Sequence, residues 1–174
     1  VSSILILDTA DESVPIRTIP RDACEFGYRN SIFKSHREWI ILSVSLALAK
    51  GDPKEIQKKI LSITRERNEK QDIGTKSCGC IFKNVAWSDA GYSPDELVRH
   101  FPEFEAIIGH PNIPASFLID NAGLKGMRFG KAIISPKHAN FFVNEGGVSS
   151  EDVRALIREA KRLVRERYGI EHRE

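Results

Sequence analysis

Several apolar runs along the chain have the length and composition of β-strands. Ser3–Leu7 predicts a buried strand. Trp39–Leu48 predicts another, because apolar residues alternate with serine in its later half. Further strands are expected over Cys78–Cys80, Met127–Ser135 and Asn140–Asn144.

Other segments show apolar residues at helical spacing and carry helix-start signals. Asp52 before Pro53 is typical of an N-cap followed by a proline in the first turn, and Ser149 with Asp152 forms a capping-box pattern. Gly169 is placed to end the last helix. The four expected helices run from Asp52 to about Asn68, from Ser93 onward, over Pro114–Asp120, and from Ser149 to Gly169.

These elements predict an α+β protein with two parts. The segment Lys70–Lys76 is polar and contains Gly74, which favours a domain boundary there. We therefore expect one domain over residues 1–74 and a second over residues 75–174. The chain lacks an initiating Met and opens on a strand-like run, so we expect it to be part of a longer protein.

Composition excludes several classes of protein. The 174 residues are 41% hydrophobic, which suits a globular core, and the net charge of +2 is too small to indicate nucleic-acid binding. No apolar run approaches the roughly 20 residues that a membrane span needs. Three cysteines do not form a secreted disulfide framework, so a cytoplasmic protein is expected.

Chemistry is concentrated around Cys80. Gly79 gives the backbone freedom beside this thiol, which is a candidate proton donor or nucleophile. Lys83 offers a charge for phosphate, and Asn84 offers an amide for a base or sugar. Cys80 could instead be a small buried apolar residue, as unpaired cysteines often are. Two thiolates at Cys78 and Cys80 do not make a zinc site without a second ligand pair, so no metal is expected.

Four motifs occur in one order along the chain: Cys24–Lys34, Gly79–Asn84, Pro114–Gly126 and Ser135–Asn144. Together with the last helix they resemble the UDP-N-acetylenolpyruvoylglucosamine reductases (UDP-N-acetylmuramate dehydrogenases). The resemblance covers nearly the whole chain. It is strongest to the branch without an extra tyrosine-bearing loop, because the spacing from Arg29 to Cys80 is short.

The resemblance implies an oxidoreductase of peptidoglycan synthesis. The family uses FAD and NADPH to reduce the enolpyruvyl ether of a UDP-sugar. Residues 1–74 would then be the second part of a FAD-binding α/β domain of the PCMH/VAO-like type, and residues 75–174 an α+β substrate-binding domain. The family's N-terminal FAD-binding segment, with its glycine-rich loop, is a partner that these residues do not include. The chain alone is therefore expected to be inactive.

The resemblance also implies three catalytic positions. Arg29 matches the arginine beside the enolpyruvyl carboxylate, which suits a planar guanidinium. Cys80 takes the position of the family's proton-donating serine, and a thiol gives up a proton more readily than a hydroxyl. The family's catalytic glutamate falls one residue beyond Glu174, which makes Glu174 a poor substitute.

Four further positions match substrate contacts. Asn84 and His138 fall where the family lines the sugar-nucleotide site, although His138 could simply end a strand. Lys70 would meet the diphosphate, or it could be an ordinary solvated lysine. Tyr28 is expected to pack on and position Arg29.

Two other functions stay open. One is a flavoprotein of the same broad fold with a different substrate, which retention of Arg29 and Asn84 disfavours. The other is a non-catalytic module that binds a UDP-sugar. Because part of the first sheet would be uncovered, we also expect exposed apolar surface and a tendency to associate.

Overall fold

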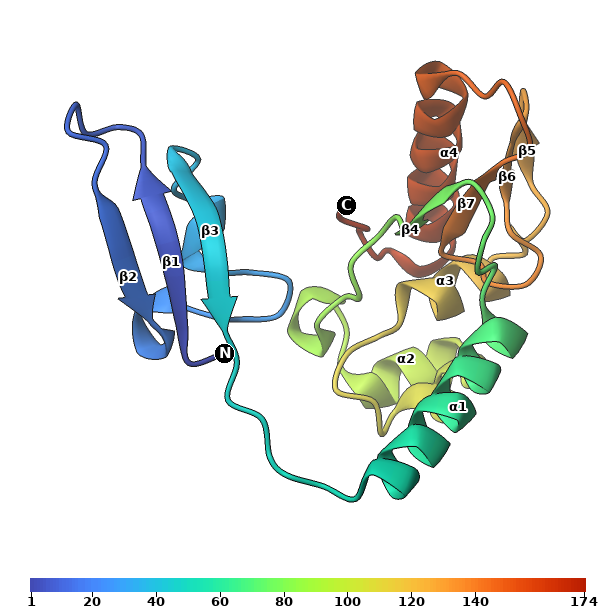
Figure 1. Ribbon diagram of the computed structural model, residues 1–174. Helices are drawn as coiled ribbons and strands as arrows, with labels where there is room; N and C mark the ends of the chain where they lie inside the picture. Colours follow the sequence, from blue (N-terminus) through green and yellow to red (C-terminus); the bar gives the residue numbers. More distant parts are fainter. The chain divides into compact units, whose positions relative to one another are not determined.

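The computed structural model describes all residues 1–174, and the α+β class is confirmed (Figure 1). The chain divides into two compact units, Val1–Gln57 and Lys58–Glu174. The functional division near residue 74 stays a prediction. None of the helices has the length and apolar character needed to cross a bilayer.

The first unit is built on a three-stranded antiparallel sheet. Strand β1 (Ser3–Asp8) lies between β2 (Ile16–Pro20) and β3 (Trp39–Ser45), as Figure 1 shows. Every second residue of β1 is buried, so Ile4 and Ile6 form the centre of a small core. Two short 3₁₀ helices, Arg21–Cys24 and Ile32–Lys34, follow β2.

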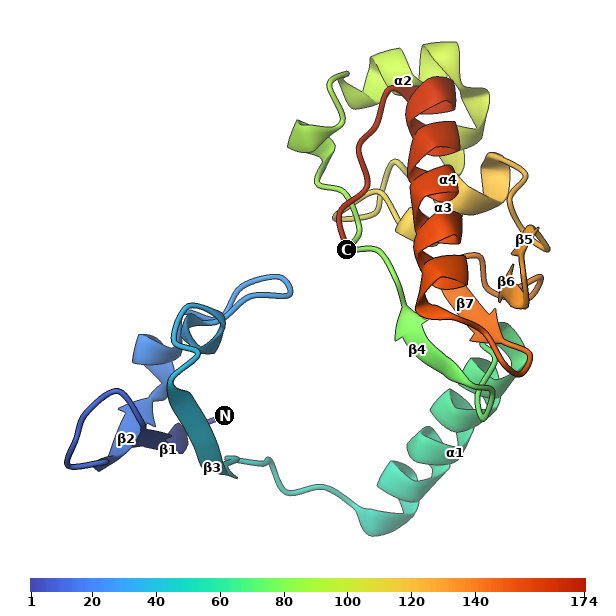
Figure 2. The same cartoon turned by 90° about the horizontal axis from the view of Figure 1, so that it is seen from above.

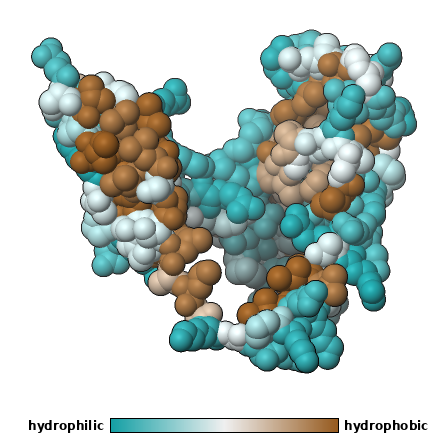
Figure 3. All heavy atoms as spheres, viewed as in Figure 1, coloured by the Kyte–Doolittle hydropathy of each residue, from teal (hydrophilic) through white to brown (hydrophobic).

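Strand β3 differs from its prediction in two respects. It ends at Ser45, three residues before Leu48, and its residues are largely exposed rather than buried. The expected apolar surface is therefore confirmed, and apolar residues gather on the visible face of this unit in Figure 3. Association through this surface stays a prediction.

Helix α1 (Pro53–Lys70) begins where the sequence indicates. The Asp52 carboxylate accepts hydrogen bonds from the backbone N–H groups of Lys54 and Glu55, both at 3.0 Å, and so caps the helix. The helix ends two residues beyond the predicted Asn68. Its apolar side chains are exposed, including Ile60 and Ile63.

The second unit contains a four-stranded antiparallel sheet in the order β4 (Ser77–Cys80), β7 (Phe141–Asn144), β6 (Ala132–Ile134) and β5 (Arg128–Phe129). The prediction of one strand over Met127–Ser135 is wrong. Gly130 takes a left-handed conformation with φ of +55°, which turns the chain and makes β5 and β6 a hairpin.

This unit also contains three α-helices: α2 (Pro94–His100), α3 (Ala115–Asn121) and α4 (Ser150–Tyr168). The capping box at Ser149 and Asp152 and the left-handed Gly169 that ends α4 are both confirmed. Helix α4 packs on β5, β6 and α3, and buries Leu156, Ala160 and Val164 (Figure 2). Two 3₁₀ helices, Trp87–Asp89 and Pro102–Ile107, complete the unit.

Candidate functional site

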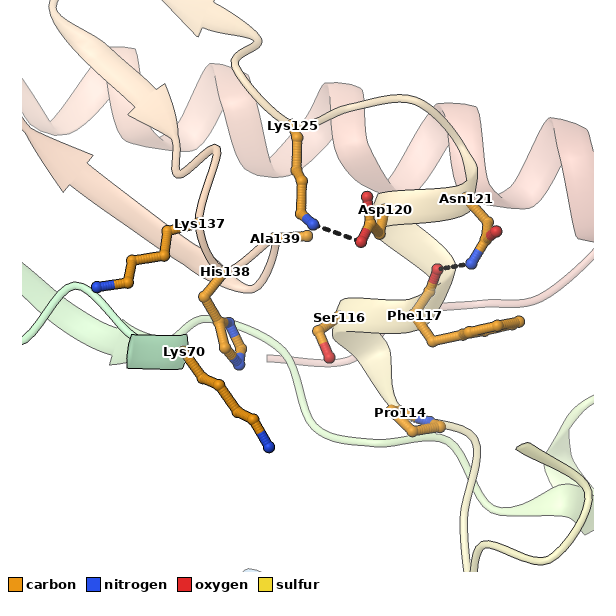
Figure 4. Close-up of a pocket in the computed structure, with 10 residues that line it drawn as sticks. All are labelled: Lys70, Pro114, Ser116, Phe117, Asp120, Asn121, Lys125, Lys137, His138 and Ala139. Atoms are coloured by element: carbon orange, nitrogen blue, oxygen red, sulfur yellow. Dashed lines mark hydrogen bonds and ion pairs between the residues drawn. The ribbon is translucent and has the colours of Figure 1, made fainter. Parts of the chain in front are cut away.

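A pocket of about 320 Å³ lies in the second unit between α3 and the loop before β7 (Figure 4). Most of its lining side chains are polar. The lining residues are Lys70, Pro114, Ser116, Phe117, Asp120, Asn121, Lys125, Lys137, His138 and Ala139. The structure thus places the two predicted substrate residues Lys70 and His138 on one pocket.

Positive charge dominates this pocket. Three lysines and one carboxylate line it, which leaves an excess of two positive charges (three minus one). Lys125 pairs with Asp120 at 2.5 Å. The Lys70 ammonium lies 2.7 Å from Glu66, one turn back on α1, and this hydrogen bond raises the pKa of Lys70. A diphosphate is a ligand of complementary charge.

The loop that carries Lys137 and His138 is held by Ser135. The buried Ser135 hydroxyl oxygen accepts hydrogen bonds from the N–H groups of Lys137 and His138, both at 2.9 Å. The same hydroxyl donates to the carboxylate of Asp72. The Lys137 ammonium donates to the carbonyl of Asn68 near the end of α1. These bonds tie the loop to the last turn of α1 and to the segment that follows it.

His138 presents a neutral imidazole. The Asn140 N–H donates to its Nδ1 at 3.3 Å, so the neutral ring carries its proton on Nε2. Partial burial lowers the pKa of His138 below 6.5, an effect that a backbone hydrogen bond and Asp72 partly oppose and Lys125 reinforces. In Figure 4 the ring lies between Lys70 and Ser116. His138 can therefore donate a hydrogen bond at pH 7 without carrying a charge.

Asn84 supports one wall of the pocket. Its side-chain oxygen accepts a hydrogen bond from the Ala115 N–H at 3.1 Å, at the first residue of α3. Val85 and Ile113 exchange backbone hydrogen bonds of 3.0 and 2.8 Å next to it. Asn84 thus fixes the helix that carries Ser116 and Asp120, and its contact with substrate stays a prediction.

Cys80 lies at the end of β4, paired with Phe141. Its side chain is exposed, so the interpretation of Cys80 as a buried apolar residue is wrong. The ring of Phe141 contacts the ring of His138, with centroids 4.8 Å apart. Phe141 therefore links β4, which ends at Cys80, to the loop that lines the pocket.

The segment after Cys80 is held in place by Asn140. The Ile81 N–H donates to the Asn140 carbonyl at 3.0 Å. The Asn140 side chain accepts from the Phe82 N–H and donates to the Phe82 carbonyl, both at 2.9 Å. The sequence did not single out Asn140 for this role, because the bonding partners are 58 residues apart.

The C-terminal residues run beside this segment. The Lys83 N–H donates to the Arg173 carbonyl at 2.8 Å, and the Lys83 ammonium donates to the Glu174 carbonyl. The Glu174 carboxylate lies 2.9 Å from Lys161 on α4. The structure therefore brings Glu174 to the segment that follows Cys80, with its carboxylate engaged in an ion pair.

Arg29 and Tyr28 form the tip of a tight turn in the first unit. Gly27 and Asn30 exchange backbone hydrogen bonds of 3.0 and 3.1 Å around them, and Arg29 has a φ of +53°. The Arg29 guanidinium carbon lies 5.6 Å from the centre of the Tyr28 ring, which confirms the expected packing. Their roles in substrate binding stay predictions.

The pocket is also lined by three residues that the sequence alone did not indicate, Ser116, Lys125 and Lys137. Lys125 stands between two glycine-containing turns, and Lys137 directly precedes His138. Both lysines belong to the motifs that carry the resemblance, and this position in the motifs is the sequence signal that could have indicated a role for them.

Comparison with known proteins gives a consistent result. A sequence profile described as UDP-N-acetylenolpyruvoylglucosamine reductase, C-terminal domain, matches residues 71–173. A UDP-N-acetylenolpyruvoylglucosamine reductase of Solibacter usitatus is 37% identical over 161 residues, 90% of this chain and 48% of that protein. One from Fervidobacterium nodosum is 37% identical over 146 residues, 84% of this chain and 40% of that protein. The chain thus spans about half the length of these curated relatives.

Solved structures agree. The crystal structure of the UDP-N-acetylenolpyruvylglucosamine reductase from Thermus caldophilus matches 98% of this chain and 50% of its own, with a TM-score of 0.66 and 28% identity. Because the profile also matches more than half of the residues, this chain belongs to the UDP-N-acetylenolpyruvoylglucosamine reductase family and contains its C-terminal domain.

Proposed function

We propose that this chain is the substrate-binding part of an enzyme that reduces UDP-N-acetylglucosamine enolpyruvate to UDP-N-acetylmuramate in peptidoglycan synthesis. The observation that carries the proposal is the cationic pocket at Lys70, Lys125, Lys137 and His138, inside or next to the matched residues 71–173. The names of the relatives support the same activity.

The first unit by itself does not fit a complete flavin site. Its only glycines are Gly27 and Gly51, and neither belongs to a glycine-rich loop of the kind that cradles a pyrophosphate. We therefore assign FAD and NADPH mainly to sequence beyond these residues, with residues 1–74 completing the flavin domain. A bound flavin supplies the hydride of such a reduction, and this chain supplies the remaining groups.

In this proposal the diphosphate of the substrate binds in the cationic pocket. Lys70, Lys125 and Lys137 offset its charge, and the Nε2–H of neutral His138 donates a hydrogen bond. Asn84 contributes through α3 and through an amide contact to the sugar nucleotide. Arg29, positioned by Tyr28, binds the enolpyruvyl carboxylate.

Cys80 supplies the proton in this proposal. The exposed thiol transfers the proton from its Sγ to the carbon next to the carboxylate, and solvent then reprotonates the thiolate. An ordinary thiol has a pKa of about 8.5, so it is a much stronger acid than a serine hydroxyl. Glu174 is a weaker candidate because its carboxylate is paired with Lys161.

We place the enzyme in the cytoplasm. Two of its three cysteines are exposed, and the structure contains no disulfide, which suits a reducing compartment.

Calorimetric titration of the intact protein with the UDP-sugar tests the binding step. Lys70→Gln should raise the Kd at least about tenfold if the lysine contacts phosphate. Lys59→Gln is the matched control, since it lies on the same helix and does not line the pocket. Equal Kd values for both variants would overturn the assignment of Lys70.

Turnover of the intact protein tests the proton donor. Cys80→Ala should abolish turnover with little change in KM, whereas Cys78→Ala should leave turnover unchanged. Near-normal turnover by Cys80→Ala would overturn the role of Cys80. Tight binding by the unmodified protein without any turnover would instead favour the non-catalytic UDP-sugar module.

A further inference from the structure

The loop between β6 and β7, residues 135–140, carries two side chains of the pocket, Lys137 and His138. Its ends are joined by the Ser135 N–H, which donates to the Phe141 carbonyl at 2.8 Å. The Phe141 N–H in turn donates to the His138 carbonyl at 2.9 Å. These bonds close the loop but leave open what holds it against the rest of the pocket.

The Ser135 hydroxyl organises the middle of the loop. The Ser135 side chain is fully buried, and its oxygen accepts from the N–H groups of Lys137 and His138, both at 2.9 Å. Neither of these N–H groups is left to bind an anion, so both residues can meet a phosphate only through their side chains. The direction of these side chains therefore depends on how firmly the Ser135 oxygen is held.

Asp72 holds this oxygen. A hydroxyl has one proton to donate, and the Ser135 hydroxyl donates it to the Asp72 carboxylate. The oxygen is thereby left as an acceptor for the two loop N–H groups. A hydrogen bond to a carboxylate is about twice as strong as one between neutral groups, so Asp72 fixes the orientation of the hydroxyl.

Asp72 is itself part of a tight turn just after α1. Its carbonyl accepts from the Thr75 N–H at 3.3 Å and from the Thr75 hydroxyl at 2.8 Å. Gly74 has a φ of +87° in this turn, a conformation that glycine adopts without strain. The carboxylate is therefore presented from a defined backbone.

A second contact joins the loop to the end of α1. The Lys137 ammonium donates to the carbonyl of Asn68, one of the last carbonyls of the helix, where a positive charge is favourable. The contacts at Asn68 and Asp72 lie on either side of Lys70 in the chain. The loop is thus joined to the segment that brings Lys70 to the pocket.

We propose that Asp72 and Ser135 are positioning residues for binding of the UDP-sugar diphosphate. This pair, the Asp72–Ser135 clasp, keeps Lys137 and His138 on the pocket that also contains Lys70. Neither residue of the clasp lines the pocket, so both act through the side chains that they place. The inference rests on the proposed function of the pocket. Its physical basis is that a site arranged in advance loses less freedom when its ligand binds.

The negative charge of Asp72 distinguishes a clasp from a simple charge effect. Burial lowers the pKa of His138 and Asp72 partly opposes this shift, so the carboxylate acts on a group in the pocket. A negative charge at this place by itself repels a diphosphate. If Asp72 were only a charge, Asp72→Ala would lower the Kd. If Asp72 is part of a clasp, the same change raises the Kd, because the loop loses its anchor.

Calorimetric titration of the intact protein with UDP-N-acetylglucosamine enolpyruvate separates these outcomes. Asp72→Ala should raise the Kd about tenfold. Asp72→Asn keeps an oxygen that accepts from Ser135, so its Kd should stay within about twofold of that of the unmodified protein. Asp95→Ala removes an equal charge from the first turn of α2, outside the pocket, and should leave the Kd unchanged.

Steady-state kinetics gives a second measure of the same role. Asp72→Ala should raise KM with little change in kcat, because the proposed proton donor Cys80 lies on β4 and is not bonded to the clasp. A lower or unchanged Kd for Asp72→Ala would overturn the proposal. Equal Kd values for Asp72→Ala and Asp72→Asn would also overturn it, since only the second variant keeps the acceptor.

Amide hydrogen exchange tests the clasp without a ligand. The N–H groups of Lys137 and His138 should exchange about tenfold faster in Asp72→Ala than in the unmodified protein. The Val85 N–H, bonded to the Ile113 carbonyl at 3.0 Å, should exchange at the same rate in both proteins. Unchanged exchange at the two loop N–H groups would overturn the clasp.

The two measurements together separate this inference from the proposed function. If the unmodified protein does not bind the UDP-sugar, the proposed function fails and the positioning role fails with it. If the unmodified protein binds, and Asp72→Ala exchanges faster but binds equally well, the proposed function stands and only the positioning role fails.

Discussion

The imidazole of His172 stacks on the phenyl ring of Phe82, with ring centroids 4.7 Å apart and an interplanar angle of 20°. His172 is 2% exposed, and neither of its ring nitrogens has a hydrogen-bond partner. Burial lowers the pKa of His172 to about 4, and the nearby Lys161 contributes to the shift. The ring is therefore neutral at pH 7 and joins the C-terminal residues to the Cys80 segment as an apolar group.

Burial of the His172 ring makes the free energy of unfolding depend on pH. The folded pKa of His172 is about 4 and its ordinary value is 6.5, so the unfolded chain binds the proton more tightly. The contribution of neutral His172 to the free energy of unfolding is fully present above pH 6.5. As the pH falls toward 4, this free energy decreases by about 3 kcal/mol. Between pH 7 and pH 4, the free energy of unfolding measured in urea should therefore decrease less in His172→Leu than in the unmodified protein. Equal losses in both proteins would contradict this prediction.

The buried amide of Asn140 should be a major source of stability. Asn140→Ala leaves the N–H and C=O of Phe82 without the partners they have at 2.9 Å. Two unsatisfied buried groups cost about 3 kcal/mol in the free energy of unfolding. Asn121→Ala is the control, because its amide makes one partly buried bond to the Phe117 carbonyl and should cost about 1 kcal/mol. Urea unfolding measures both, and equal costs would count against the role of Asn140.

Asn84 can be tested for its two roles separately. Asn84→Ala removes the acceptor for the Ala115 N–H and should lower the free energy of unfolding by about 1 kcal/mol. Asn84→Asp keeps an acceptor at the start of α3, so its stability should stay close to normal. Its added negative charge should nevertheless weaken binding of the UDP-sugar diphosphate, which calorimetry would detect. Unchanged affinity in the stable Asp variant would remove Asn84 from the binding site.

Local signals in the sequence were sufficient for the helix ends. The capping box at Ser149 and the left-handed Gly169 depend only on neighbouring residues, and both were predicted correctly. Strand β2 was missed because Arg17 and Thr18 interrupt its apolar pattern, and its pairing with β1 depends on a partner distant in sequence. The exposed β3 resembles a buried strand in sequence, because an apolar run does not reveal whether anything covers it.

The residues of the candidate site also differ in whether the sequence alone could indicate them. Cys80 and His138 could be chosen from their motifs, and the structure relates them through Phe141. Lys125 and Lys137 could not be assigned, because they lie on one pocket only after α3 and the loop before β7 come together. Their proximity to Lys70 depends on bonds such as the one from Lys137 to Asn68, which spans 69 residues.

The charge excess in the pocket makes ligand binding depend on salt. Ions at 0.1 M screen charges over about 10 Å, so affinity for a UDP-sugar should fall as ionic strength rises. Lys137→Gln removes one positive charge from the lining and should raise the Kd about tenfold at low salt while making the salt dependence shallower. Lys131→Gln removes an equal charge from the β5–β6 turn. It should leave the Kd at low salt and its salt dependence unchanged. Calorimetric titration of the intact protein at several salt concentrations checks this, and a common salt dependence for all three proteins would show that the diphosphate binds elsewhere.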